Sequence, residues 1–137
     1  MNPFIVYRAG YKYQLAADYS VKLANVRPIE PVNHEYFTLT LDGWLTVKEG
    51  YAWDGASGPT HDSKSSMRPS LAHDVLWQML RVGLLDEAQR HETNLEFHKL
   101  CIEDGMWPWR ADVWLWAIEK FGKFYTGTGE EPTLTAP

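Results

Sequence analysis

The hydrophobic period of the chain changes near its middle, and this change constrains the fold more than any other feature. Up to about residue 53, apolar and β-branched residues form short, partly alternating runs, which are typical of half-buried strands. From residue 69 onward, apolar residues recur every three or four positions, which is the period of a helix lying on a core. The sequence therefore predicts an α+β fold, with an N-terminal antiparallel β meander followed by three C-terminal α-helices.

Turn residues divide the first half into predicted strands. Ala9-Gly10 has the chemistry of a two-residue hairpin, and Asp42-Gly43 marks a second turn. The segment 26–35 carries two prolines, so it is expected to be a loop or an edge strand. The predicted strands lie at 4–8, 11–15, 18–23, 37–41 and 44–53.

Start and stop signals divide the second half into predicted helices over 69–85, from 86 to about 104, and over 108–122. Pro69 suits the first turn of the first helix. Asp86, followed three residues later by Gln89, is a capping-box signal for the second helix, and Gly105 is its expected stop. The third helix is expected to begin at Pro108 and to bury one face before Gly122 ends it. That face comprises Ala111, Trp114, Leu115, Ile118 and Phe121.

Length and composition bound the possible classes. A chain of 137 residues can bury one core, so we expect a single domain over 1–125 and a polar C-terminal tail over 126–137. The lone Cys101 excludes an intramolecular disulfide and a cysteine-built zinc site. The net charge of -5 argues against a nucleic-acid partner. We expect no membrane span, since no apolar run is long enough, and no signal peptide.

Aromatic residues are the compositional outlier, with seven Trp, seven Tyr and five Phe. Aromatics on this scale can build a compact core, a sugar-stacking groove or a subunit interface. Composition alone leaves all three open.

The stretch YAWDGASGPTHD at 51–62 is the first candidate for a functional site. Its glycines and small residues allow the backbone to turn several polar groups toward one point. Trp53, Asp54, Gly55 and Ser57 are the candidate residues there, Asp54 as a catalytic group or metal ligand. The alternative is an Asx-turn, in which the Asp54 carboxylate only satisfies nearby amides.

His73 and Asp74 in the first predicted helix are the second candidate. Neighbouring helical residues point about 100° apart, so the two cannot form a dyad with each other. They could divide the work, His73 facing a substrate or a water and Asp74 facing a metal, a loop or another helix. An acid near a helix N-terminus can also simply complement the helix dipole. Trp77 and Arg81 continue the stripe of His73.

The second predicted helix adds Arg90 and Asn94 to the candidate site. Antiparallel packing of the two helices would place Asn94 beside His73, where its amide could fix the imidazole tautomer. His91 and His98 are seven residues apart, whereas a helical zinc pair needs a spacing of four. We expect the loop after the last strand to fold over the first helix, so that Asp54 and His73 share one polar chamber.

Several of these segments together resemble a known family. They are GYAWDGASGP at 50–59, SLAHDVLWQMLR at 70–81, Arg90 with Asn94, and the closing FG at 121–122. In this order they resemble the phage and prophage family called domain of unknown function 1353, over about residues 5–122. The resemblance implies a phage-encoded protein near tail or lysis functions, located in the cytoplasm of the infected bacterium or in the virion. Asn94 stands where that family usually has Asp, which would weaken the activity if the Asp is catalytic.

A looser likeness is to phospholipases of the A-two type, in which a Gly-rich loop precedes a helix bearing His-Asp. It implies that Gly55, Gly58 and Asp74 would hold calcium, that His73 would activate water, and that Asn94 would orient His73. These enzymes depend on disulfides that this chain cannot make.

The sequence thus leads to an expected His/Asp hydrolase-like site acting on a cell-envelope substrate, with a divalent cation, calcium or zinc, as the cofactor. His73 would be the general base, and Asp74 or Asp54 would hold the metal or orient the water. The rival expectation is a non-enzymatic tail or capsid accessory protein whose partners are other phage structural proteins. In that case Asp54 would bridge Arg81, and the polar cluster would be structural. An inhibitor of a host protein is a third class.

Overall fold

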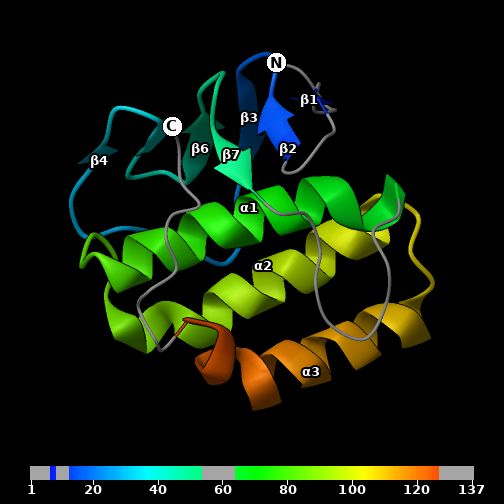
Figure 1. Cartoon of the computed structure of the whole chain (residues 1–137). Coiled ribbons are helices and arrows are strands. Elements are labelled where there is room, and N and C mark those ends of the chain that lie inside the picture. Colours follow the sequence, from blue (N-terminus) through cyan, green and yellow to red (C-terminus); the bar gives the residue numbers. More distant parts are fainter. Residues whose placement is uncertain (1–6, 9–12, 54–63, 127–137) are drawn as a thin grey trace.

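The computed structural model describes residues 7–8, 13–53 and 64–126 of the chain. In this part of the molecule, two antiparallel sheets lie on one side of three α-helices (Figure 1). The predicted α+β class, with strands preceding three C-terminal helices, is confirmed.

The strands of the described part form two sheets rather than one. The first has the order β1-β2-β7 and the second the order β3-β6-β5-β4. In the second sheet, β4, β5 and β6 form a meander, and β3 lies on the far side of β6. The strands are β1 (Tyr7–Arg8), β2 (Tyr13–Leu15), β3 (Tyr19–Lys22), β4 (Val32–Asn33), β5 (Phe37–Leu39), β6 (Trp44–Val47) and β7 (Ala52–Trp53).

The predicted return strand over 44–53 is divided between the two sheets, and this part of the prediction was wrong. Gly50 has a φ of 98°, a left-handed conformation that no regular strand can contain. Its N–H donates to Leu15 O at 2.8 Å, and Leu15 N–H donates to Tyr51 O at 2.8 Å. The chain therefore leaves β6, turns at Gly50 and joins β2 as β7.

The predictions for β4 and for the pairing of β1 with β2 agree with the structure. β4 lies at the edge of its sheet, as expected for the proline-bearing segment 26–35. β1 and β2 pair antiparallel, with Tyr7 opposite Leu15, while the predicted turn at Ala9-Gly10 lies outside the described residues.

The helices are α1 (Lys64–Arg81), α2 (Arg90–Glu103) and α3 (Pro108–Thr126), with a short 3₁₀ helix, η1 (Glu87–Gln89), before α2. They run up and down in sequence, with α2 between α1 and α3 and with α3 farthest from the strands (Figure 1). No helix in the described part of the chain is long and apolar enough to cross a membrane.

The boundaries of α1 differ from the prediction at both ends. The helix begins at Lys64, so Pro69 lies inside it and not in its first turn. It ends at Arg81 because Gly83 takes a φ of 83°. The N–H groups of Leu84 and Gly83 then donate to Met79 O at 2.8 Å and to Leu80 O at 3.2 Å, which closes a Schellman motif.

The expected capping box of the second helix does not form, because Asp86 caps the short 3₁₀ helix η1 and α2 begins after Gln89 without a side-chain cap. The Asp86 carboxylate accepts from Ala88 N–H at 3.0 Å, but Gln89 turns away. Gln89 instead donates to Arg27 O at 3.0 Å and accepts from Arg27 N–H at 3.3 Å. Gly105, with a φ of 98°, ends α2 as predicted.

The third helix begins at Pro108 as predicted, but it continues past Gly122 to Thr126. A single glycine costs a helix interior only ~1 kcal/mol relative to alanine, so it does not by itself end a helix.

Two apolar clusters of described residues enclose α2. The larger lies between the strands and α1, and includes Phe37, Leu45, Trp53 and Leu71. The smaller lies between α2 and α3, and comprises Phe97, Cys101, Met106, Ala111 and Trp114 with Ile118 against them. Since α2 is covered on both sides, polar side chains that it buries need partners from the neighbouring elements.

Candidate functional site

His73 on α1 and Asn94 on α2 meet at the centre of the helical layer. His73 Nε2 lies 2.8 Å from Asn94 Oδ1, and both side chains are buried. The antiparallel packing of α1 and α2 brings them together, so the predicted contact between these two residues is confirmed. The spacing of polar residues in the sequence was sufficient to find it.

The neighbours of Asn94 fix the hydrogen positions in this contact. Trp77 Nε1–H can only donate, and it donates to Asn94 Oδ1 at 3.1 Å. Asn94 Nδ2 donates to the Glu119 carboxylate on α3 at 2.9 Å. The amide orientation is thus set from both sides, so the neutral His73 must donate from Nε2, and its Nδ1 carries the lone pair.

Burial keeps the His73 imidazole uncharged. The residue is 8% exposed, and its ring packs 4.5 Å from the Trp77 ring and 5.1 Å from the Phe97 ring, between centroids. Desolvation lowers the pKa of His73 to about 4; the hydrogen bond with Asn94 opposes this shift, and the nearby Arg90 charge adds to it. At neutral pH the site therefore contains a neutral base that is almost fully buried.

Arg90 closes this cluster on one side. Its guanidinium lies 4.8 Å from the centroid of the Trp77 ring, a cation–π contact. It also forms an ion pair with Glu87. Trp77 Nε1 makes a second bond, to Thr93 Oγ1 at 3.0 Å, and Thr93 Oγ1 donates to Arg90 O at 2.7 Å.

Two histidine–carboxylate contacts join α2 to α3 beside the cluster. His91 Nδ1 lies 2.9 Å from Glu119, and His98 Nε2 lies 2.7 Å from Asp112. The hydrogen bond with Glu119 raises the pKa of His91. Partial burial acts to raise the pKa of Glu119, but its bonds with Asn94 and His91 outweigh burial and leave that pKa below its usual value.

Arg81, which was predicted to continue the stripe of His73, lies with Asp74 on a different stripe of α1. Asp74, Gln78 and Arg81 follow one another at helical spacing, and Gln78 accepts from the Tyr51 hydroxyl at 3.0 Å. Burial raises the pKa of Tyr51, Asp74 raises it further, and Arg81 lowers it, so both charged groups act on this phenol. The structure therefore does not bring Asp74 and Arg81 into the contact of His73 with Asn94.

Trp53 is a core residue at the end of β7. It is fully buried, and its Nε1 donates to Ser70 Oγ at 3.1 Å. Ser70 Oγ donates in turn to Met67 O at 2.9 Å. This chain of bonds ties β7 to α1.

The remaining predicted site residues, Asp54, Gly55 and Ser57, lie outside the described residues, as does Gly58. The shared chamber of Asp54 and His73 stays a prediction. Within residues 7–8, 13–53 and 64–126, no cluster of three His, Cys, Asp or Glu side chains could hold a metal ion. The expected calcium or zinc site, which includes Asp54, stays a prediction as well.

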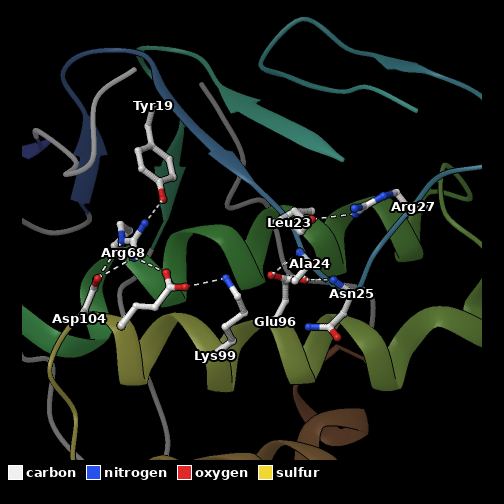
Figure 2. Close-up of polar contacts among 10 residues, drawn as sticks. Tyr19, Leu23, Ala24, Asn25, Arg27, Arg68, Glu96, Lys99 and Asp104 are labelled. Carbon is white, nitrogen blue, oxygen red and sulfur yellow. Dashed lines mark hydrogen bonds and ion pairs between the residues drawn. The ribbon is translucent and has the colours of Figure 1, made fainter. Parts of the chain in front are cut away.

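Sequence reasoning missed a charged network between the strands and the helices (Figure 2). Arg68 on α1 donates to Asp104 at 2.7, 2.9 and 3.1 Å and to the Tyr19 hydroxyl at 2.8 Å. Burial raises the pKa of Tyr19 to about 12, although Arg68 opposes the shift. The phenol thus stays protonated and accepts from the guanidinium.

Glu96 on α2 is a second charged residue of this network that sequence reasoning missed (Figure 2). Its side chain is 0% exposed and accepts from Ala24 N–H at 2.9 Å and Asn25 N–H at 2.6 Å, at the end of β3. A signal was present, because Glu96 interrupts the apolar stripe of α2 beside Phe97 and Leu100. A charged residue on a buried stripe indicates a specific partner.

A shallow groove of about 400 Å³ lies between residues 29–32 and residues 83–86. Its lining combines apolar Ile29 and Leu84 with acidic Glu30 and Asp86. Within the described residues it contains none of the predicted site residues.

Comparison with known proteins adds no assignment. A scan against protein-family models, a search of curated proteins and a search of solved structures each find no match to this chain.

Proposed function

We propose that this chain is a non-enzymatic accessory component of a phage particle, such as a tail or capsid protein, that acts by contact with other proteins. The observation that carries the proposal is the enclosure of His73. A general base must reach its substrate, whereas His73 is buried between Trp77 and Phe97 and its Nε2 is bonded to Asn94. The phage origin is supported by the sequence resemblance.

The surface of α3 gives independent support for a role in contact. Large exposed aromatics are the usual anchors of protein interfaces. On α3, Trp109 and Trp116 are 64% and 57% exposed. These tryptophans are therefore candidate anchors for a protein partner.

The second candidate is the hydrolase-like protein acting on a cell-envelope substrate. One observation favours it: Asn94 orients the His73 imidazole and leaves Nδ1 as the basic nitrogen. In this candidate Nδ1 activates water, and Asp54 or Asp74 holds a divalent cation or positions that water.

One experiment separates the two candidates. The purified chain and its His73→Gln variant are incubated with peptidoglycan and with phospholipid vesicles, each with and without calcium or zinc. We expect neither protein to release soluble fragments or fatty acids above the blank. Hydrolysis by the wild type that falls by about 10²-fold or more in His73→Gln would establish the hydrolase instead. His98→Gln is the matched control, because this histidine also pairs with a neighbouring helix but lies outside the His73 cluster.

The particle assignment has its own test. Virions of the encoding phage are purified on a density gradient and their proteins are measured by mass spectrometry. We expect the chain to sediment with the particles in constant proportion to the capsid protein. Its presence in the lysate and absence from the particles would overturn this part of the proposal.

A further inference from the structure

We propose that the outward face of α3 binds a second copy of this chain through an antiparallel pair of α3 helices. The face consists of Trp109, Val113, Trp116 and Lys120, and we call it the α3 stripe. This inference rests on the proposed function, which assigns protein contact as the role of the chain. It adds that the partner is a second copy of the same chain.

The stripe lies opposite the buried face of α3. At about 100° per residue, its four members fall within roughly 60° of one another around the helix axis. Ala111, Trp114 and Ile118 face the other way and pack in the cluster between α2 and α3. The three apolar stripe residues are 64%, 43% and 57% exposed, in chain order, so α3 is apolar on two opposite sides.

The spacing of the stripe makes it complementary to itself. Its members are separated by four, three and four residues, so the pattern reads the same in both directions. A two-fold axis between Val113 and Trp116 would place each Val113 against Trp116 of the second copy. The same axis would place each Trp109 against Lys120 of the second copy.

Charge favours this antiparallel arrangement over a parallel one. In a parallel pair in register, Lys120 would face Lys120, and two like charges would meet in the seam. In the antiparallel pair, each Lys120 ammonium faces an indole ring instead. Lys120 already lies 6.0 Å from the Trp116 ring centroid within one chain, so its ammonium is close to the aromatic surface.

Residues on one flank of the α3 stripe allow the two helices to approach closely, whereas residues on the other flank weaken the contact between the two copies. Each flank of an antiparallel pair meets the same flank of its partner, so Arg110 would lie near the small Ala117. On the other flank, Asp112 would lie near Glu119 of the second copy, although each already pairs with a histidine of its own chain. This acidic flank opposes association.

The available area predicts a weak dimer. The exposed parts of the two tryptophans and the valine, with the lysine stem, offer on the order of 400 Å² of apolar surface per copy, against the ~800 Å² per partner of a standard interface. We therefore expect a dissociation constant on the order of 10 to 100 µM.

The test is sedimentation of the full chain over about 5 to 500 µM, which brackets that constant. The mass of the wild type should rise from 15.8 kDa toward that of a dimer. Trp109→Glu and Val113→Glu should each weaken association by at least ~10-fold while the circular dichroism spectrum stays unchanged. Trp107→Glu is the matched control, since this tryptophan is equally exposed but precedes the helix.

The orientation is tested by disulfide cross-linking. A mixture of Arg110→Cys and Ala117→Cys chains, which keep the stripe intact, should give a mixed dimer on mild oxidation. Arg110→Cys alone should give little, because antiparallel pairing separates the two copies of position 110 by about two helical turns. A wild type that is monomeric at all concentrations would overturn the inference. That result is expected if residues 127–137 or an unlike partner occupies the face instead. Equal weakening by Trp107→Glu would overturn it too. Either result would leave the proposed lack of hydrolysis untouched, since that is read from substrate release.

Discussion

The network between the strands and the helices differs in charge from the network among the helices. Arg68 and Glu96 cross from α1 and α2 toward the strands as charged groups, and their partners are a phenol, a carboxylate and backbone amides. His73 and Asn94 join α1 to α2 as neutral groups, held by Trp77. The first network is strong because each charge has directed partners, whereas the second is stable only while its imidazole remains uncharged.

The largest expected effect comes from breaking the charged network at Glu96. Glu96→Ala removes the acceptor of the Ala24 and Asn25 amides and should cost about 4 kcal/mol of unfolding free energy, at roughly 2 kcal/mol for each hydrogen bond to the carboxylate that is lost. Urea denaturation measures the loss. The control is Glu103→Ala at the end of the same helix, whose half-exposed carboxylate should contribute under ~1 kcal/mol. Similar losses in both variants would contradict the role assigned to Glu96.

Protonation of His73 should break the neutral network with a slightly smaller effect. The pKa of His73 is about 4 in the folded protein against 6.5 in the unfolded chain. The unfolded chain therefore binds the extra proton first as the pH falls. Stability is complete above about pH 6.5 and declines toward pH 4, by on the order of 3 kcal/mol from this group.

This decline can be measured by urea denaturation between pH 6.5 and about pH 5, where most carboxylates remain ionised in both the folded and the unfolded chain. His73→Gln should flatten the profile, because its side chain does not titrate and can still donate to Asn94. The assignment would fail if the wild type and His73→Gln lost stability in parallel over this interval.

The smallest expected effect comes from the pair of His91 with Glu119, whose pH dependence is opposite in sign to that of His73. The pKa of His91 is raised by Glu119, so this pair contributes stability that is full below pH 6.5 and is lost as the pH rises through the folded-state pKa. The side chain of His91 is largely exposed, so the contribution should be only a few tenths of a kcal/mol. Melting temperatures of the wild type and His91→Gln, compared at pH 6 and 8, should converge at the higher pH. A constant difference would point to a packing effect instead.

Local signals in the sequence predicted the helices and the pairing of His73 with Asn94. The helical period places these residues on facing stripes of antiparallel helices, and Gly105 ends α2 through its own conformation. The partner of Asn94 on the third helix, Glu119, could not be predicted, because the relative rotation of α2 and α3 depends on how Phe97 and Trp114 pack.

The arrangement of the strands was less accessible to sequence reasoning. The run 44–53 reads as one strand, since nothing near Gly50 in the sequence reveals that the backbone of Leu15 bonds to Gly50 and Tyr51. Pairing between distant segments decides such a case, and local propensity does not. The loop at 54–58, which the sequence marks most strongly, lies outside the described residues.

The turn at Gly50 also bears on the order in which the molecule assembles. β7 pairs with β2, so Tyr13 must find Trp53 across a long stretch of chain, whereas α1 and α2 are joined by a short connection. Contacts between neighbours in sequence form faster than contacts that close long loops. We expect the helical hairpin to form early and the amino-terminal strands to attach late during refolding. A chain from which β1 and β2 have been clipped would therefore leave the β2-facing side of β7 as an open edge, able to recruit a strand from another molecule.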